Sequence, residues 1–335
     1  MFKYLISINP LGLMYGSAGA FLSPENLVGR SGAKFPPDAA TLAGLMFSIN
    51  KVNEKFTQQT LRDNLYVAGP FWAKSTNRST KQNFFIPIPW HKIISKKGFG
   101  EWKIENNQWK LEKNIDADKP EADYRWQTIE SWNTSAKGLK TSNQSIADNP
   151  WKFGSLIHPK IQPSERCVVK SDGLFLENSA QIPDDVCLVY LSTYPIDNGW
   201  YKFGGENHIV EISCDEISPK IIKLLNQPIG KSFALITPGV WGSNRISHRQ
   251  PQPEDHSFPE TVQMLTDKPV PYRFRSQGTL GRGRYAVPAG SVYVLKEPIN
   301  KPWWEWDEKW FPNEGYSLKK LGCGLCLPVE IEGVN

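Results

Sequence analysis

The stretch FPPDAATLAGLMFSIN, residues 35–50, predicts a buried helix that begins after Asp38. Asp38 is a typical N-cap residue, and the apolar residues that follow lie almost all round the helix. Gly44 costs about 1 kcal/mol relative to alanine within a helix. We therefore expect the backbone of another element to lie close to Gly44.

Strand-like runs surround this helix on both sides. The run at 2–8 precedes it, after which a glycine-rich loop is expected, and runs at 65–71 and 84–88 follow. Strand, helix, strand, strand is the first part of a ferredoxin-like unit.

The second half of the chain repeats the pattern of strands around a helix. Its expected strands are at 174–176, 186–191, 208–213, 233–236 and 292–295. Its expected helix is at 219–225 and begins at Ser218-Pro219. The prediction is an α+β fold of two ferredoxin-like (RRM-like) domains with antiparallel sheets and glycine-rich loops. The expected domains are residues 1–157, with an insertion at about 92–149, and residues 158–335.

The insertion is polar and rich in Asn, Lys and Trp. Residues 101–104 and 108–111 alternate polar and apolar side chains around Asn106-Asn107, which is typical of a hairpin. We expect this hairpin to protrude. The alternative is a solvent-exposed loop without a role.

Bulk composition indicates a soluble chain of 335 residues with a formal net charge of +5. Five scattered cysteines (Cys167, Cys187, Cys214, Cys323 and Cys326) favour reduced thiols and a cytoplasmic location over a disulfide framework. Cys323 and Cys326 form a C-x-x-C without a second ligand pair, so no metal or other cofactor is predicted. A signal peptide at 1–20 is the alternative to a first strand, but Pro10 and Gly12 interrupt it.

Motifs of common enzyme classes are absent from the sequence. There is no P-loop, no G-x-S-x-G and no H-E-x-x-H, and no two of the five histidines share a helix face. We therefore predict that the chain is not an enzyme. A histidine that is paired across the fold stays open as an alternative.

The strongest functional signal is the distribution of charge between residues 269 and 295, where Asp and Glu are absent. Arginines alternate with glycines in this segment, and Tyr272, Phe274 and Tyr285 are candidates to stack on bases. Glycines expose backbone N–H groups to anions, and arginine forks bind phosphate. The segment favours a single-stranded RNA site over an idle loop.

Two further basic, glycine-rich runs lie at 233–253, which is also free of acids, and at 319–324. The candidate RNA-binding residues are Lys34, Arg245, Arg249, Arg273, Arg275, Gly281, Arg282, Gly283, Arg284, Lys319 and Lys320.

Several of these loops also resemble a known family. Residues 35–44 resemble the N-terminal signature of the RAMP superfamily of CRISPR proteins. AGPF at 68–71, IPIP at 86–89, DGLF at 172–175, RYAVPAGSVY at 284–293 and GCG at 322–324 resemble, in order, the type III-B family called Cmr subunit three. FGGEN at 203–207 resembles its G-G-E loop, with Asn207 where arginine is usual.

The resemblance implies a non-catalytic, Cas-five-like subunit of a ribonucleoprotein complex for antiviral defence. Such a subunit clamps the 5′ tag of the crRNA, pairs with the large Cas-ten-type subunit and contacts the first backbone RAMP subunit. The hairpin of the insertion would be the thumb that kinks the guide. Two alternatives are a RAMP-superfamily endoribonuclease that processes crRNA, which needs a general base, and a sugar-binding module, which the 13 tryptophans suggest.

Overall fold

A computed structural model of the chain describes residues 1–15, 35–74, 82–115, 121–162, 164–165, 167–169, 173–205, 207–242, 247–273, 275–276, 279–281 and 283–334. Only the backbone is described at residues 158, 175–177, 275, 276, 279 and 280. The loop predicted after the first strand lies largely within 16–34, outside the described residues. The structure is α+β, with several antiparallel sheets and few helices, so the predicted class is confirmed.

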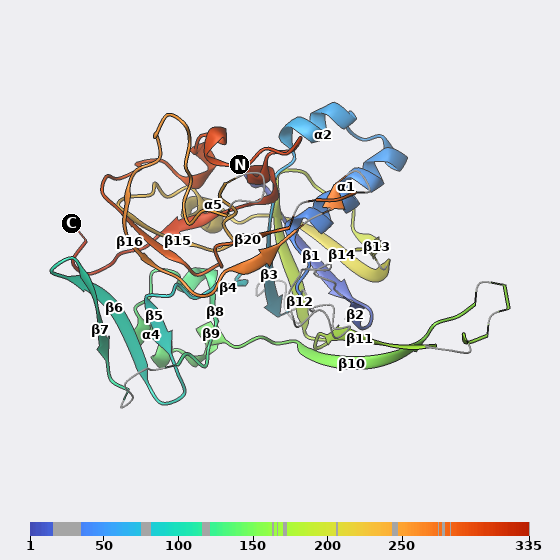
Figure 1. Ribbon diagram of the computed structural model, residues 1–335, viewed down its shortest axis with the longest axis horizontal. Helices are drawn as coiled ribbons and strands as arrows, with labels where there is room; N and C mark the ends of the chain where they lie inside the picture. Colours follow the sequence, from blue (N-terminus) through green and yellow to red (C-terminus); the bar gives the residue numbers. More distant parts are fainter. Residues whose placement is uncertain are drawn as a thin grey trace.

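An eight-stranded antiparallel sheet forms the centre of the molecule (Figure 1). In spatial order its strands are β13 (Gly199–Phe203), β14 (His208–Glu216), β1 (Tyr4–Pro10), β12 (Val186–Ser192), β3 (Val67–Lys74), β4 (Phe85–Pro87), β8 (Trp126–Thr128) and β9 (Ile146–Ala147). β1 and β12 are rich in β-branched and large apolar side chains, and β12 is buried along its whole length.

A second antiparallel sheet has four strands and lies in the C-terminal part of the chain. Its order is β16 (Thr261–Leu265), β21 (Val292–Leu295), β15 (Ser232–Leu235) and β22 (Cys326–Pro328). One hydrophobic core runs through both sheets and includes Leu5, Tyr190, Phe233 and Trp306.

The two sheets share one strand order. Neighbouring strands of the central sheet lie in the spatial order β14, β1, β12, β3. Those of the C-terminal sheet lie in the order β22, β15, β21, β16. When each set of four is numbered by its place in the chain, both orders are fourth, first, third, second. The predicted ferredoxin-like unit has residues 84–88 as its third strand, after 65–71. In the structure the strand between β1 and β3 is instead β12, about a hundred residues later in the chain. The hydrogen bonding of the central sheet therefore crosses the predicted boundary between residues 157 and 158, and that domain division stays a prediction.

Four α-helices and five short 3-10 helices complete the described fold. They are α1 (Ala39–Asn53), α2 (Gln58–Asn64), α4 (Ala136–Thr141), α5 (Pro219–Leu225), η2 (Ile129–Ser131), η3 (Asn143–Ser145), η4 (Trp303–Glu305), η5 (Glu308–Trp310) and η6 (Leu318–Leu321). α1 begins after Asp38 as predicted, but it buries one face only. Gly44 is exposed with open space around it, so the close backbone approach expected there is wrong.

The insertion contains the predicted hairpin. β6 (Phe99–Glu105) and β7 (Gln108–Lys113) pair around Asn106 and Asn107, both at positive φ, and β5 (Lys92–Ile94) completes a three-stranded sheet. This hairpin does not protrude, because the N–H of Ile104 donates to the carbonyl of Glu332 at 2.9 Å and Gln263 donates to the carbonyl of Asn107 at 2.6 Å.

The element that protrudes is a different hairpin (Figure 1). It consists of β10 (Lys152–Pro159) and β11 (Leu174–Gln181), whose inner end pairs with β2 (Met14–Tyr15). A hairpin does protrude, as predicted, but it is the β10–β11 hairpin and not the β6–β7 hairpin of the insertion.

Candidate nucleic-acid interface

The basic segment folds into a narrow ladder of short strands. β17 (Val270–Tyr272) pairs with β20 (Arg284–Ala286), and β18 (Arg275–Ser276) pairs with β19 (Thr279–Leu280) beyond them. Arg273 donates from its Nε to the carbonyl oxygen of Gly281 at 2.6 Å, across the ladder. Gly283 is exposed, whereas Arg282 lies outside the described residues.

The three predicted basic runs meet in space. Gly239 forms a bridge with Val287, and the N–H of Tyr285 donates to the Ser247 hydroxyl at 3.0 Å, which joins the first run to the ladder. Gly324 donates to the carbonyl of Pro238 at 2.9 Å, which joins the last run to the first. We call residues 238–242, 247–249, 270–273, 275–276, 279–281, 283–287 and 319–324 the loop cluster.

Arg284 is the most buried of the loop-cluster cations whose side chains are described. Its side chain is 1% exposed and forms an ion pair with Glu314, and it donates to the carbonyl of Gly242 at 3.4 Å. Its Nε has no partner among the described residues. The side chain thus holds the ladder against neighbouring loops, and the RNA-binding role predicted for it stays a prediction.

Lys319 is likewise held inside the protein. Its Nζ donates to the carbonyls of Trp304 at 3.0 Å and Trp306 at 2.5 Å, and it lies over the ring of Trp303 at 5.8 Å. Burial lowers the pKa of Lys319, although Glu308 opposes the shift. An ammonium group that already donates to two carbonyls has little left for phosphate.

Lys320 connects the same run to α2. It donates to the carbonyl of Arg62 at 2.9 Å and lies between the rings of Tyr66 and Tyr316, at 5.9 and 5.6 Å from their centroids. Lys319 and Lys320 therefore fix the position of the terminal glycine turn, a role that sequence reasoning missed.

Arg249, in the first run, is exposed. Its carbonyl accepts a hydrogen bond from the Tyr293 hydroxyl at 2.5 Å, which anchors the backbone and leaves the side chain at the surface. Lys34 and Arg245 lie outside the described residues, and of Arg275 only the backbone is described.

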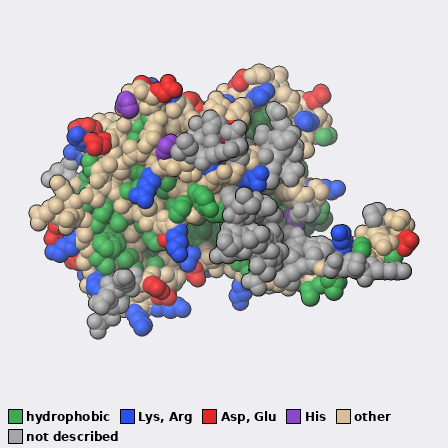
Figure 2. Space-filling model, viewed as in Figure 1, with side chains coloured by type: hydrophobic (Ala, Val, Ile, Leu, Met, Phe, Trp, Pro, Cys, Tyr) green, Lys and Arg blue, Asp and Glu red, His purple; other side chains and the backbone are tan. Residues whose placement is uncertain are grey.

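The aromatic candidates differ in exposure. Tyr285 is 48% exposed, as base stacking requires. Tyr272 is buried in the core, so its predicted role in stacking is wrong, and Phe274 lies outside the described residues. Basic and acidic side chains are interspersed on the described part of one face, with apolar surface between them (Figure 2). The described part of this face is therefore mixed in charge and is not a broad basic patch.

The C-x-x-C pair is structural. Cys323 accepts a hydrogen bond from the N–H of Val240 at 3.0 Å, and burial raises its pKa to about 12. Burial also raises the pKa of Cys326 well above its ordinary value. Within the described ranges, no group of three or more His, Cys, Asp or Glu residues is placed to hold a metal ion.

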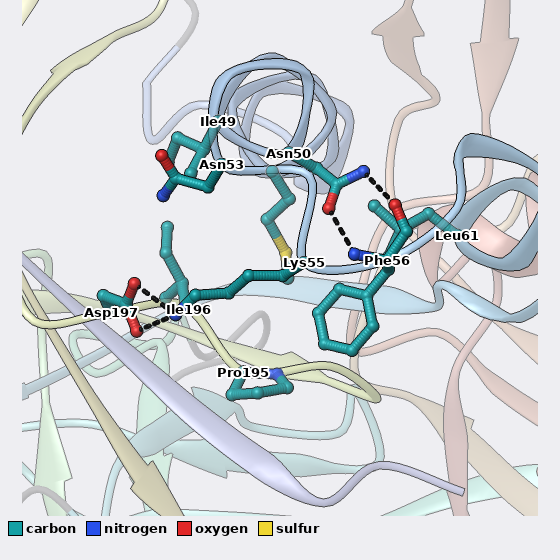
Figure 3. Close-up of a pocket in the computed structure, with 10 residues that line it drawn as sticks. Ile49, Asn50, Asn53, Lys55, Phe56, Leu61, Pro195, Ile196 and Asp197 are labelled. Carbon is teal, nitrogen blue, oxygen red and sulfur yellow. Dashed lines mark hydrogen bonds and ion pairs between the residues drawn. The ribbon is translucent and has the colours of Figure 1, made fainter.

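A small pocket lies near the C-terminal end of α1 (Figure 3). Asn50 holds Phe56 at its wall through two hydrogen bonds of 2.8 and 3.0 Å, and the ammonium of Lys55 contacts the Asp197 carboxylate at its rim. Its volume of about 50 Å³ is far below the roughly 300 Å³ at which ligand pockets begin. None of the candidate RNA-binding residues lines it.

His91 is a histidine that the structure removes from the candidates for a general base. It is 1% exposed, and both ring nitrogens lack partners among the described residues. Burial, with Lys92 as a smaller cause, lowers the pKa of His91 to about 3. The neutral ring is sealed from substrate.

Replacing His91 by leucine should protect the protein from acid. The unfolded chain protonates this histidine near pH 6.5, whereas the folded chain protonates it only near pH 3. Between these values the unfolded state binds the extra proton, so stability is full above pH 6.5 and falls as the pH is lowered. Between pH 7.5 and pH 4.5 the free energy of unfolding of the wild type should fall by about 2–3 kcal/mol more than that of His91→Leu.

Urea unfolding at both pH values measures this difference, with the exposed His256→Leu as the control. An equal acid loss in His91→Leu and in the wild type would contradict the burial of an unpartnered ring.

None of the described helices combines the length and apolar character needed to cross a membrane. A family model described as CRISPR-associated protein (Cas_Cmr3) matches residues 7–331. The chain belongs to this family. The resemblance inferred from the ordered motifs is confirmed, and the Cas_Cmr3 match spans both sheets and the loop cluster. No curated protein matches the chain.

Several solved structures show distant similarity to the chain. A chain of the Type III-B Cmr-beta bound to cognate target RNA is 14% identical, with a TM-score of 0.47 over 87% of this chain and 86% of that one. The Csm1-Csm4 cassette with AMPPNP gives 10% identity and a TM-score of 0.39 over 99% of both chains. A chain of the Csm3-Csm4 subcomplex in the type III-A CRISPR-Cas interference complex is 11% identical, with a TM-score of 0.39 over 89% of this chain and 99% of that one. Membership of the Cas_Cmr3 family rests on the family match.

Proposed function

We propose that the chain is the non-catalytic RNA-binding subunit of a cytoplasmic type III-B CRISPR effector complex that serves antiviral defence. In this role it clamps the 5′ tag of the crRNA and joins the large Cas-ten-type subunit to the backbone RAMP subunit. The observation that carries the proposal is the meeting of three glycine-rich basic runs in one loop cluster, on a member of the Cas_Cmr3 family.

Each sheet, in this proposal, is the sheet of one ferredoxin-like unit. The shared strand order supports this, together with α1, which connects β1 to β3 as the first helix of such a unit does. The hairpin strand β13 stands where the second helix is usual. We place the boundary between β14 and β15, rather than at 157/158, since the first sheet is complete only at Glu216.

Most of the candidate RNA-binding residues divide into two groups in this proposal. Arg249, Arg273, Arg275 and Arg282 contact the RNA backbone, while Gly281 and Gly283 let it approach. The buried or anchored cations Arg284, Lys319 and Lys320 hold the loops in the shape that the RNA meets.

RNA binding measured against salt concentration tests the assignment. Arg249→Ala combined with Arg275→Ala should weaken binding of an RNA oligonucleotide that carries the 5′ tag. Each phosphate contact that is lost should reduce the slope of log K against log [salt] by about 1. Lys296→Ala, which removes an exposed lysine that is ion-paired with Glu260, is the control and should leave the slope unchanged.

An unchanged affinity and slope in the double variant would remove these arginines from the RNA site. Incubation of the wild type with repeat RNA tests the alternative. Specific cleavage that one His→Ala change abolishes would replace the proposal by a processing endoribonuclease.

A further inference from the structure

The ladder formed by β17 and β20 has a buried inner face and an open outer face (β20 lies near the centre of Figure 1). Successive side chains of a strand point to opposite faces, and burial along the ladder follows this alternation. The inner face consists of the buried residues Tyr272, Arg284 and Ala286. The outer face consists of residues that are exposed or half-buried, namely Pro271, Arg273, Gly283 and Tyr285.

Tyr285 provides an aromatic platform on the outer face. The residue is 48% exposed, and the register places it opposite Pro271, which is also exposed. Paired side chains in an antiparallel ladder lie about 4.5–5.5 Å apart, so the proline ring extends the apolar surface beside the tyrosine ring. The N–H of Tyr285 donates to the Ser247 hydroxyl at 3.0 Å. A base that stacks on Tyr285 therefore meets a ring whose backbone is already fixed.

Arg273 lies at the other end of the same face. Its Nε donates to the carbonyl oxygen of Gly281 at 2.6 Å. Because Gly281 is four residues before Tyr285, this bond directs the arginine side chain along the ladder and away from the tyrosine ring. It uses one of the five N–H donors of the guanidinium, which can still grip a phosphate with the others.

Gly283 separates the tyrosine ring from the guanidinium. It is exposed and has no side chain, so the outer face is open at this point. Residues two apart in a strand are separated by about 6–7 Å, which leaves room for a sugar between the two groups. Since Asp and Glu are absent from residues 269–295, no carboxylate of the ladder repels a phosphate. An aromatic ring, a bare backbone and a cation follow each other in the order of base, ribose and phosphate.

We propose that the outer face of the ladder seats one unpaired nucleotide of the crRNA tag. The base stacks on Tyr285, the ribose lies over Gly283 and the phosphate binds Arg273. The inference rests on the proposed function and adds the unit that this face holds. Stacking on a tyrosine tolerates every base, so the seat selects a splayed, single-stranded nucleotide and not a particular base. The core of a protein interface, by contrast, is apolar and depleted of charge.

Removal of single bases from the RNA tests the seat. Tag-bearing RNA oligonucleotides that are abasic at one tag position at a time are titrated against the full chain and its variants, by fluorescence anisotropy at several salt concentrations. Tyr285→Ala removes the ring and Tyr285→Phe keeps it. Trp200→Ala is the matched control, because it removes a 73% exposed ring from β13 in the central sheet. These positions are exposed, so the variants should fold, and circular dichroism checks this.

Tyr285→Ala should weaken binding of the intact RNA about 5- to 100-fold and leave the salt slope unchanged. The loss should vanish for the one RNA that lacks the seated base, because the ring then has nothing to stack on. Tyr285→Phe and Trp200→Ala should bind like the wild type. Arg273→Ala should instead reduce the slope of log K against log [salt] by about 1.

Other outcomes overturn the inference. Equal binding of the intact RNA by Tyr285→Ala and the wild type removes the seat, while the proposed function stands. An equal loss on every abasic RNA shows that the ring supports the ladder and holds no base. Unchanged RNA binding by Tyr285→Ala with weaker binding of the purified Cas-ten-type subunit assigns the face to a protein. Failure of the wild type to bind the tag-bearing RNA removes the proposed function and the seat with it.

Discussion

Gly322→Ala should lower the free energy of unfolding by about 2–5 kcal/mol. Gly322 ends η6 at φ 68°, where an L residue costs about 1–2 kcal/mol. A Cβ there would lie 2.5 Å from the Cβ of Ala68, 2.6 Å from its Cα and 2.8 Å from the carbonyl oxygen of Val67. β3 pairs with strands on both sides and cannot withdraw, so overpacking adds about 1–3 kcal/mol.

Gly315→Ala is the matched control for this substitution. Gly315 has φ 80°, but no atom lies within 4 Å of its ideal Cβ. The Gly315→Ala variant should therefore lose only about 1–2 kcal/mol of its free energy of unfolding, which is the cost of the backbone conformation. Urea unfolding compares the two variants, and equal losses would show that Gly322 is needed for its φ alone and not for the contact with β3.

Arg284→Met should lower the free energy of unfolding by about 2–4 kcal/mol. The substitution keeps an apolar stem but leaves the Glu314 carboxylate without its cation and the Gly242 carbonyl without its donor. Breaking a buried ion pair costs about 3–5 kcal/mol, and the 21% exposure of the Glu314 side chain reduces this figure. Chemical denaturation at neutral pH measures the loss.

Arg249→Ala is the companion experiment. This exposed arginine should contribute under about 0.5 kcal/mol to stability, yet its loss should reduce the salt slope of RNA binding by about 1. Arg284→Met, assayed where it is folded, should leave the slope intact. A reduced slope in folded Arg284→Met with unchanged stability would move Arg284 into the RNA-contacting group.

Local signals in the sequence were enough to place several elements. Asp38 before an apolar run predicted where α1 begins, and Ser218-Pro219 did the same for α5. Asn106-Asn107 predicted the turn between β6 and β7, because Asn accepts positive φ more readily than most residues. These features depend on a few adjacent residues, which is why the sequence alone reveals them.

The role of the buried cations depended on residues far along the chain. The acid-free run at 269–295 looked unpaired, but Glu314, which neutralises Arg284, lies thirty residues later in the sequence. Lys319 and Lys320 are held by backbone carbonyls of Trp304, Trp306 and Arg62, which no charge count includes. Exposed and buried arginines look alike in a sequence window, so the candidate list combined both.

The place of the protruding hairpin was also a long-range property. The turn of β6 and β7 is a strong local signal, but whether a hairpin stands free depends on what packs against it. Here Glu332 and Gln263, both more than 150 residues away, hold the β6–β7 hairpin to the body. β10 begins with Lys-Phe-Gly-Ser and has no tight two-residue turn after it, so the sequence predicted only the start of β11 in the hairpin that protrudes.

The position of β1 between β12 and β14 sets the order in which the chain is able to fold during synthesis. β1 leaves the ribosome well before both strands that pair with it, which come from residues 186–216. At about 5–20 residues per second, both edges of an apolar strand stay open for roughly ten seconds or more. A nascent chain in this state invites edge-to-edge pairing with other chains. Chaperone binding to the emerging β1, or early capture by an assembling partner, would protect this strand until β14 arrives.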